Sequence, residues 1–152
     1  MDIVNLADIP EHLPRLAARH HHQWSHLNPE STLRRRVEKM RAHLENRLIP
    51  STFAAMNDGP LGSASLVEHD MDTRTDLSPR LASAFVAPGH RRTGVGSALV
   101  QHGMDQARRN GIRTLYLFTP DRAPFYAKLG WRKVSDEDYH GRTVTVMEIE
   151  LT

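Results

Sequence analysis

The sequence of 152 residues contains no cysteine. This absence excludes a disulfide framework, a thiolate nucleophile and any zinc or iron–sulfur site with cysteine ligands. The sequence also has no apolar run close to the ~20 residues of a membrane-spanning helix. Its first residues carry neither the basic nor the hydrophobic region of a signal peptide. We therefore expect a cytoplasmic protein without a membrane partner.

An excess of charge of one sign is also missing. Twenty Lys and Arg against eighteen Asp and Glu give a net charge of only +2, whereas nucleic-acid-binding proteins carry a concentrated positive field. The basic run Arg34-Arg35-Arg36 is not interleaved with aromatic side chains, so we expect no nucleic-acid partner. Hydrophobic residues at 39% and charged residues at 25% are typical of a globular domain, and the length suits one domain over residues 1–152.

Periodicity and turn residues predict alternating strands and helices. The turn Asn57-Asp58-Gly59 between two apolar segments is typical of a β-hairpin. The hydrophobic spacing predicts helices over 11–24, 31–47, 94–110 and 122–129. Strands are expected near the N-terminus and at 52–56, 61–67, 81–86, 114–118, 132–134 and 143–151. This order predicts an α/β (α+β) fold class, with a mixed sheet and helices on both faces.

A basic, glycine-containing turn joins the strand 81–86 to the following helix. The turn and first helical residues are Arg91, Arg92, Thr93, Gly94, Val95, Gly96 and Ser97. The first N–H groups of a helix lack intrahelical partners and lie at the positive end of its dipole, so they suit a phosphate. The two glycines let oxygen atoms approach the backbone closely. A simple strand-to-helix connector is the alternative.

Two common phosphate loops do not fit this turn. A Walker A loop would need Lys where Val95 stands, and a dinucleotide fingerprint would need Gly or Ala where Leu99 stands. The pattern that remains is Arg-x-x-Gly-x-Gly over residues 91–96. About thirty residues later, after a further predicted strand, residues 123–131 read Ala-Pro-Phe-Tyr-Ala-Lys-Leu-Gly-Trp.

Together the two segments resemble the GCN5-related N-acetyltransferase (GNAT) superfamily. The first is similar to its pyrophosphate loop, and the second to its Phe-Tyr-x-Lys-x-Gly-Phe/Trp segment. The resemblance implies a mostly antiparallel sheet of about seven strands. It also implies an acetyl-CoA-dependent N-acetyltransferase that acts on a small-molecule amine or a peptide N-terminus. This chemistry needs no metal, and a homodimer stays open.

The resemblance also implies roles for particular residues. The backbone of Phe85 and Val86 would bind the pantetheine arm, with the Val86 N–H stabilising the oxyanion, and residues 91–97 would bind the pyrophosphate. Tyr126 would protonate the departing thiolate, because a Tyr with an ordinary pKa of ~10 is protonated at neutral pH. Direct attack by the amine is expected, since there is no cysteine to form an acyl-enzyme. A CoA-binding regulatory module without turnover is the alternative function.

The general base is less directly indicated, because the strand 81–86 has no acidic residue. The nearest acids stand in Glu68-His69-Asp70-Met71-Asp72. Alternation along a strand would put Glu68 and Asp70 on one face. We expect Glu68 to accept the proton of the amine, directly or through water, and Asp70 to attract a cationic acceptor. A solvated hairpin end is the alternative.

The acceptor pocket of the family is built from the first two helices and the late strand hairpin. We therefore expect Trp24, His22, Tyr139 and His140 to line it, although Trp24 would also suit the core. The run from His20 to His22, together with His26, offers no third ligand with the geometry of a metal site, so we expect no metal.

Overall fold

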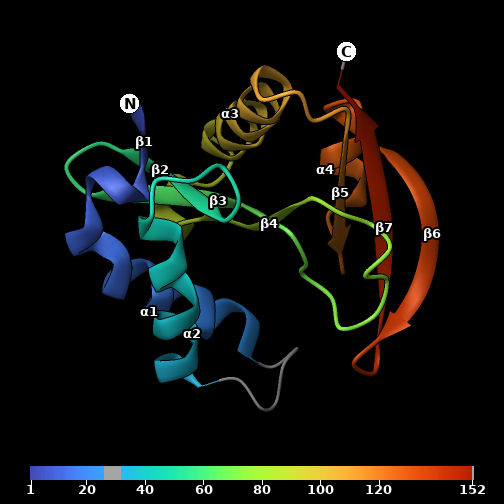
Figure 1. The fold of residues 1–152 in the computed structure, drawn as a ribbon, viewed down its shortest axis with the longest axis horizontal. Helices are drawn as coiled ribbons and strands as arrows, with labels where there is room; N and C mark the ends of the chain where they lie inside the picture. The colour runs from blue at the N-terminus through green and yellow to red at the C-terminus, as the bar shows by residue number, and fades with distance from the viewer. Residues whose placement is uncertain (26–31, 152) are drawn as a thin grey trace.

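The computed structural model describes residues 1–25 and 32–151, and a seven-stranded sheet lies at its centre (Figure 1). The strand order is β1-β2-β3-β4-β5-β7-β6, and neighbouring strands are antiparallel except for β4 and β5. The strands are β1 (Asp2–Asn5), β2 (Ser51–Met56), β3 (Pro60–Val67), β4 (Arg80–Val86), β5 (Thr114–Thr119), β6 (Arg132–Tyr139) and β7 (Arg142–Glu150). The predicted mixed sheet is confirmed.

Two pairs of helices cover the two faces of the sheet. The helices are α1 (Leu13–Trp24), α2 (Leu33–Arg41), α3 (Val95–Arg109) and α4 (Ala123–Lys128). Each face of the sheet has its own hydrophobic core, and successive side chains of β2 point into opposite cores. Phe53 and Ala55 pack with α3 and α4, whereas Ala54 packs with α1 and α2. None of the helices in the described ranges is long and apolar enough to cross a membrane.

Two predicted boundaries are wrong. The helix expected over 31–47 ends as an α-helix at Arg41 and continues as a 3-10 turn over Ala42–Leu44, while residue 31 lies outside the described residues. His43 is buried in that turn, and its Nδ1 lies 2.8 Å from the hydroxyl of Thr52 on β2, so contact with the sheet ends the helix. The strand expected at 132–134 extends to Tyr139. The prediction was too short because β6 is an edge strand, and its solvent-facing polar side chains do not show the apolar alternation of a half-buried strand.

The parallel strands β4 and β5 meet at one end and then diverge. Their register contains the single pair Arg80–Tyr116, supported by a hydrogen bond of 3.1 Å from the Tyr116 N–H to the carbonyl of Pro79. Beyond Arg80, β4 continues to pair with β3, but that pairing shifts between Ser63 and Ser65. Ser83 in the shifted region has φ +55°, the left-handed conformation found at bulges. One edge of β4 therefore faces β5 without a pairing strand.

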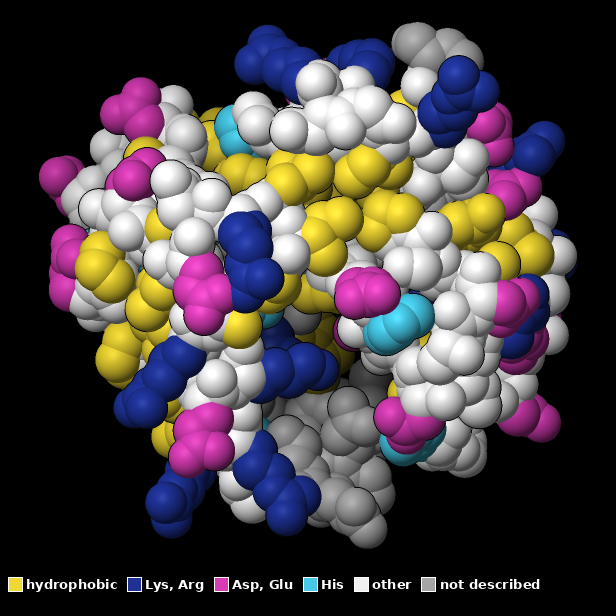
Figure 2. Space-filling model, viewed as in Figure 1, with side chains coloured by type: hydrophobic (Ala, Val, Ile, Leu, Met, Phe, Trp, Pro, Cys, Tyr) yellow, Lys and Arg dark blue, Asp and Glu magenta, His cyan; other side chains and the backbone are white. Residues whose placement is uncertain are grey.

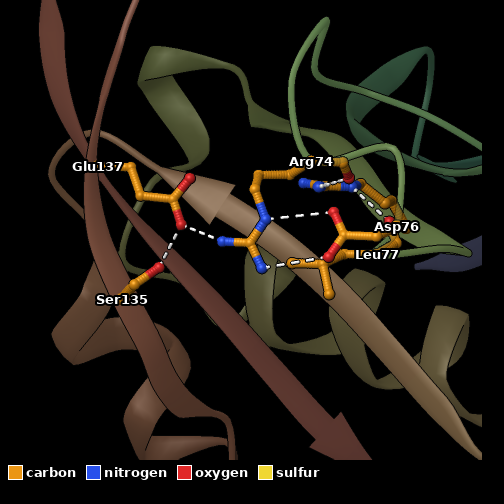
Figure 3. Close-up of polar contacts among 6 residues, drawn as sticks. Arg74, Asp76, Leu77, Ser135 and Glu137 are labelled. Carbon is orange, nitrogen blue, oxygen red and sulfur yellow. Dashed lines mark hydrogen bonds and ion pairs between the residues drawn. The ribbon is translucent and has the colours of Figure 1, made fainter.

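Residues 68–79, the β3–β4 loop, cross from one half of the sheet to the other, as Figure 1 shows. Met71 packs among side chains of the β6–β7 hairpin, and the Arg74 guanidinium binds both Asp76 and Glu137 on β6 (Figure 3). Arg80, which is fully buried, donates to the carbonyls of Leu77 (2.9 Å) and Arg74 (3.0 Å). These contacts hold residues 68–72 beside the divergence of β4 and β5.

Gly62 on β3 gives a first prediction about this region. A Cβ at Gly62 would lie 2.5 Å from the carbonyl oxygen of Phe85 and 3.2 Å from Leu99 Cδ1. Because the nearest atom belongs to the backbone of β4, Gly62→Ala should destabilise the fold by about 1–3 kcal/mol in urea unfolding. Gly89→Ala is the control, since a Cβ there meets nothing within 4 Å. Equal stability of the two variants would contradict the close approach of β3 and β4.

Candidate active site

The connection from β4 to α3 leaves backbone donors free at the surface. Gly94 precedes the helix with φ +86° and ψ −1°, and no side chain in the described part of the chain caps this end. The first intrahelical bond runs from the Ala98 N–H to the Gly94 carbonyl (3.0 Å). The amides of Val95, Gly96 and Ser97 therefore lack intrahelical acceptors. This geometry suits an anion such as a pyrophosphate.

The two arginines of this turn are placed differently. The Arg91 Nε donates to the Val86 carbonyl (3.0 Å), and its guanidinium carbon lies 5.9 Å from the centroid of the Phe85 ring. Arg92 is exposed and has φ +64°, while the Thr93 hydroxyl donates to the His90 carbonyl. Arg91 thus covers the end of β4, and Arg92 lies in solvent beside the free amides.

The two motifs lie side by side around the end of β4. A Cβ at Gly96 would be 3.4 Å from Val86 Cγ2 and 3.5 Å from Phe125 Cζ. The first turn of α3, the last residue of β4 and the helix α4 therefore share one corner of the molecule. The Phe85 side chain points to the opposite face, where its ring centroid lies 6.1 Å from that of Trp24.

Tyr126 on α4 is 9% exposed, and its ring packs edge-on against Phe125 and Trp131, with centroids 5.0 and 6.1 Å away. Burial raises the pKa of Tyr126 to about 12, with a smaller opposing effect from Arg122. The phenol therefore stays protonated at neutral pH. Its hydroxyl has no hydrogen-bond partner among the residues that the structure describes, so its proton is available to a ligand. Trp131 is buried, as expected of a core residue.

The acids after β3 do not share a strand face, and that prediction is wrong because β3 ends at Val67. The Glu68 side chain is 75% exposed, with a carboxylate oxygen 3.7 Å from His69 Nε2. Asp70 instead lines a cleft on the α2 side of the sheet, and burial raises the pKa of its carboxyl group. The Asp70 charge also raises the pKa of Tyr126, so the two groups lie within electrostatic range of each other.

The cleft is formed where α2, the ends of β3 and β4 and the β3–β4 loop come together. Figure 2 shows a hollow in the middle of this face, with basic, acidic and histidine side chains around it. The residues that line the cleft are Arg36, Lys39, Met40, His43, Ser65, Val67, His69, Asp70, Ala82 and Ser83.

The residues expected to line the acceptor pocket are only partly brought together. The Tyr139 hydroxyl accepts a hydrogen bond from the Asp72 N–H (2.9 Å), and His140 Nε2 lies 2.7 Å from Asp72 Oδ2. These contacts join the β6–β7 turn to the β3–β4 loop. Trp24 packs on Phe85, but His22 is exposed on α1 and is not among the residues that line the cleft. His26 lies outside the described residues.

A buried polar network under α1 and α2 was missed from the sequence. The Arg36 Nη2 donates to His20 Nδ1 (2.7 Å) and to Ser83 Oγ (2.9 Å), so His20 carries its proton on Nε2 and donates to Ser63 Oγ (2.9 Å). Burial, reinforced by Arg36, lowers the pKa of His20 well below its usual value. The signal was the helical spacing of Arg36, Met40 and His43, which puts the arginine on the buried face.

Arg36 therefore connects α2 to the bulge of β4. Ser83 holds the left-handed conformation at that bulge, which costs a residue with a side chain of the order of 1 kcal/mol. A charged donor on its hydroxyl offsets part of this cost. The network thus supports the point at which β4 turns away from β5.

The sequence model of a family described as "Acetyltransferase (GNAT) domain" matches residues 50–133, which is more than half of the chain. The chain belongs to the GNAT acetyltransferase family. Acetyl-CoA is the acetyl donor of this family, so the predicted family, enzyme class and cosubstrate follow from the match. The matched residues include β2 to β5, the glycine-containing turn over residues 91–97 and Tyr126.

Solved structures of other acetyltransferases have the same fold. An aminoglycoside 6'-N-acetyltransferase complexed with coenzyme A is 16% identical, with a TM-score of 0.79 over 100% of this chain and 98% of that one. The ribosomal-protein-alanine N-acetyltransferase of Brucella melitensis is 17% identical, with a TM-score of 0.78 over 99% and 100%. The protein yncA of Salmonella typhimurium, solved with acetyl-CoA, is 16% identical, with a TM-score of 0.70 over 100% and 94%.

Metal-ligating side chains do not gather anywhere in the described ranges of this GNAT protein. Within those ranges, no three His, Cys, Asp or Glu side chains stand close enough together to hold a metal ion.

Proposed function

We propose that this GNAT protein transfers an acetyl group from acetyl-CoA to a primary amine by direct attack, with Tyr126 as the general acid. The observation that carries the proposal is the divergence of β4 from β5 beside the uncapped start of α3. An extended pantetheine arm would lie along the unpaired edge of β4 at Phe85 and Val86. Its pyrophosphate would bind the free amides of residues 94–97, with Arg91 and Arg92 adding positive charge.

Each group would then have a defined part in the reaction. The neutral amine nitrogen attacks the thioester carbonyl carbon, and the Val86 N–H donates to the oxyanion that forms. When the carbon–sulfur bond breaks, the Tyr126 hydroxyl gives its proton to the thiolate, and the phenolate is reprotonated from water. The proton released by the attacking amine passes to a carboxylate after β3, directly or through water. Trp24, Tyr139 and His140 would border the acceptor, and His22 would contact only an acceptor that extends past α1.

Asp70 suits the role of base better than Glu68, which was first expected to have it. The Asp70 carboxylate lines the cleft and lies within electrostatic range of Tyr126, whereas Glu68 is largely in solvent. Burial raises the pKa of Asp70, and a base works best when its pKa approaches the working pH. Glu68 stays the alternative base.

The function is tested by incubating the protein with acetyl-CoA and a panel of amines while free thiol is measured. Acetylated product together with stoichiometric CoA supports transfer. Acetyl-CoA binding without any turnover across the panel would favour the CoA-binding regulatory module instead.

The two carboxylates give a second prediction. Asp70→Asn should lower kcat/KM by about 10- to 100-fold at high pH, the usual scale for a lost general base. Asp70 acts only when ionised, and its folded pKa is raised, so the wild-type advantage should grow as pH rises through that pKa and vanish below it. Ionisation of the amine affects both proteins equally and cancels in the ratio. Glu68→Gln should leave the profile nearly unchanged, and a larger loss in that variant would reassign the base to Glu68.

A further inference from the structure

The cleft beside the β4 bulge holds charges of both signs that are not paired with each other. Arg36 and Lys39 line it from α2, and Asp70 lines it from the β3–β4 loop. Burial raises the pKa of the Asp70 carboxyl group, and the charges of Lys39, Arg80 and Arg36 partly oppose this rise, so all four charges lie within electrostatic range. In the part of the chain that the structure describes, however, no ion pair within 4 Å and no hydrogen bond joins Asp70 to any of the three cations.

Arg36 is held in place with part of its donor set unused. Its Nη2 is committed to His20 and Ser83, so the guanidinium cannot turn away from the cleft. Its Nε is buried and has no hydrogen-bond partner. A buried donor without a partner costs free energy. The guanidinium thus lines the cleft as a positive charge whose donors are not all satisfied.

We propose that the acceptor amine of this enzyme carries a carboxylate close to the amine, so that its carboxylate binds Arg36 and Lys39 while its amine lies at Asp70. This substrate class rests on the proposed acetyltransferase function and adds the identity of the acceptor. An amine with a nearby carboxylate satisfies charges of both signs that the cleft keeps apart. A polycationic acceptor would leave both basic side chains unpaired and would be repelled by them.

An amine with a nearby carboxylate occurs in two kinds of acceptor, a free amino acid and the N-terminus of a peptide with an acidic first residue. The experiment therefore compares matched acceptors with acetyl-CoA and thiol detection. The small-molecule arm uses β-alanine, β-alaninamide and propylamine, with spermidine as a polycation. The peptide arm uses short amidated peptides that begin with aspartate or with asparagine. Rates are expressed per neutral amine, because replacing or removing the carboxylate also changes the amine pKa.

In at least one arm, the carboxylate-bearing acceptor should give a kcat/KM roughly 10- to 100-fold above its uncharged counterpart, the scale of one charge-assisted hydrogen bond. Lys39→Met and Arg36→Gln remove the two charges, and at least one of them should abolish this preference. Arg41→Met is the matched control, because Arg41 is exposed at the end of the same helix and does not line the cleft. It should keep the preference.

Equal rates for charged and uncharged acceptors in both arms would overturn the substrate class, as would a preference that survives in both cleft variants or turnover confined to spermidine. Failure of the proposed function gives a different result. In that case acetyl-CoA yields CoA with no amine in the panel, charged or uncharged, whether or not it raises the melting temperature of the wild-type protein.

Discussion

Replacing Tyr126 with Phe is expected to lower kcat by about 10²-fold or more, with little change in the affinity for acetyl-CoA. The substitution keeps the ring that packs against Phe125 and Trp131 but removes the proton donor. Because burial raises the pKa of Tyr126 to about 12, the phenol is fully protonated over the usual assay range. The wild-type rate should therefore show no loss from Tyr126 ionisation below about pH 10. Steady-state kinetics at saturating acetyl-CoA measure the effect on kcat.

Tyr116→Phe is the matched control for this prediction. Tyr116 lies on β5 and pairs with Arg80 through its backbone, so the loss of its hydroxyl should leave kcat close to that of the wild type. Wild-type turnover in Tyr126→Phe would mean that water or another group protonates the thiolate. A fall in kcat accompanied by an equal loss of acetyl-CoA affinity would assign Tyr126 to binding.

Replacing Gly94 with Val should abolish stabilisation by acetyl-CoA. At a concentration of ~100 Kd, a ligand adds about 2.7 kcal/mol to the free energy of unfolding, which is roughly 5–10 °C in Tm for a domain of this size. Gly94 holds φ +86° directly before the free amides of α3. A β-branched residue strongly disfavours that conformation and places its side chain beside the anion site. Thermal melts with and without acetyl-CoA measure the difference, and desulfo-CoA should act almost as well as acetyl-CoA because it retains the phosphates.

Gly111→Val separates binding from strain in this experiment. Gly111 follows the opposite end of α3 with φ +80°, and a Cβ there also meets nothing within 4 Å. Both variants should lose about 1–3 kcal/mol of stability from the backbone conformation. Only Gly94→Val should also lose the shift with acetyl-CoA. A full shift in Gly94→Val would place the pyrophosphate elsewhere.

The features that the sequence predicted correctly are local ones, whose conformation is set by residues that are adjacent in the sequence. The hairpin at Asp58-Gly59 follows from the two residues themselves, and both have positive φ. The glycine-containing turn before α3 likewise specifies its own backbone. The expected roles of Tyr126 and of the two motifs came from the resemblance to the family rather than from neighbouring residues, and they stay predictions.

The features that could not be predicted depend on contacts between distant segments. Asp70 differs from Glu68 because the β3–β4 loop is drawn across to β6 by Arg74 and Glu137, which are 63 positions apart in the sequence. Arg36 stands in a run of three arginines, and its helical spacing to Met40 and His43 places it on the buried face, whereas Arg34 pairs in solvent with Glu38 at 3.5 Å. The local pattern does not show what the Arg36 guanidinium contacts, because its partners His20 and Ser83 lie on other elements.

Because a single registered pair joins β4 and β5, the sheet consists of two hydrogen-bonded parts that meet at a seam between these strands. One part contains β1 to β4 and the other contains β5 to β7. Among residues 1–25 and 32–151, backbone hydrogen bonds cross this seam only near Arg80, so amide exchange on one side need not follow exchange on the other. A pantetheine arm lying in the seam would supply hydrogen bonds along the free edge of β4. In that state the cosubstrate would be a temporary strand of the protein, and release of CoA would return the sheet to two separately opening parts.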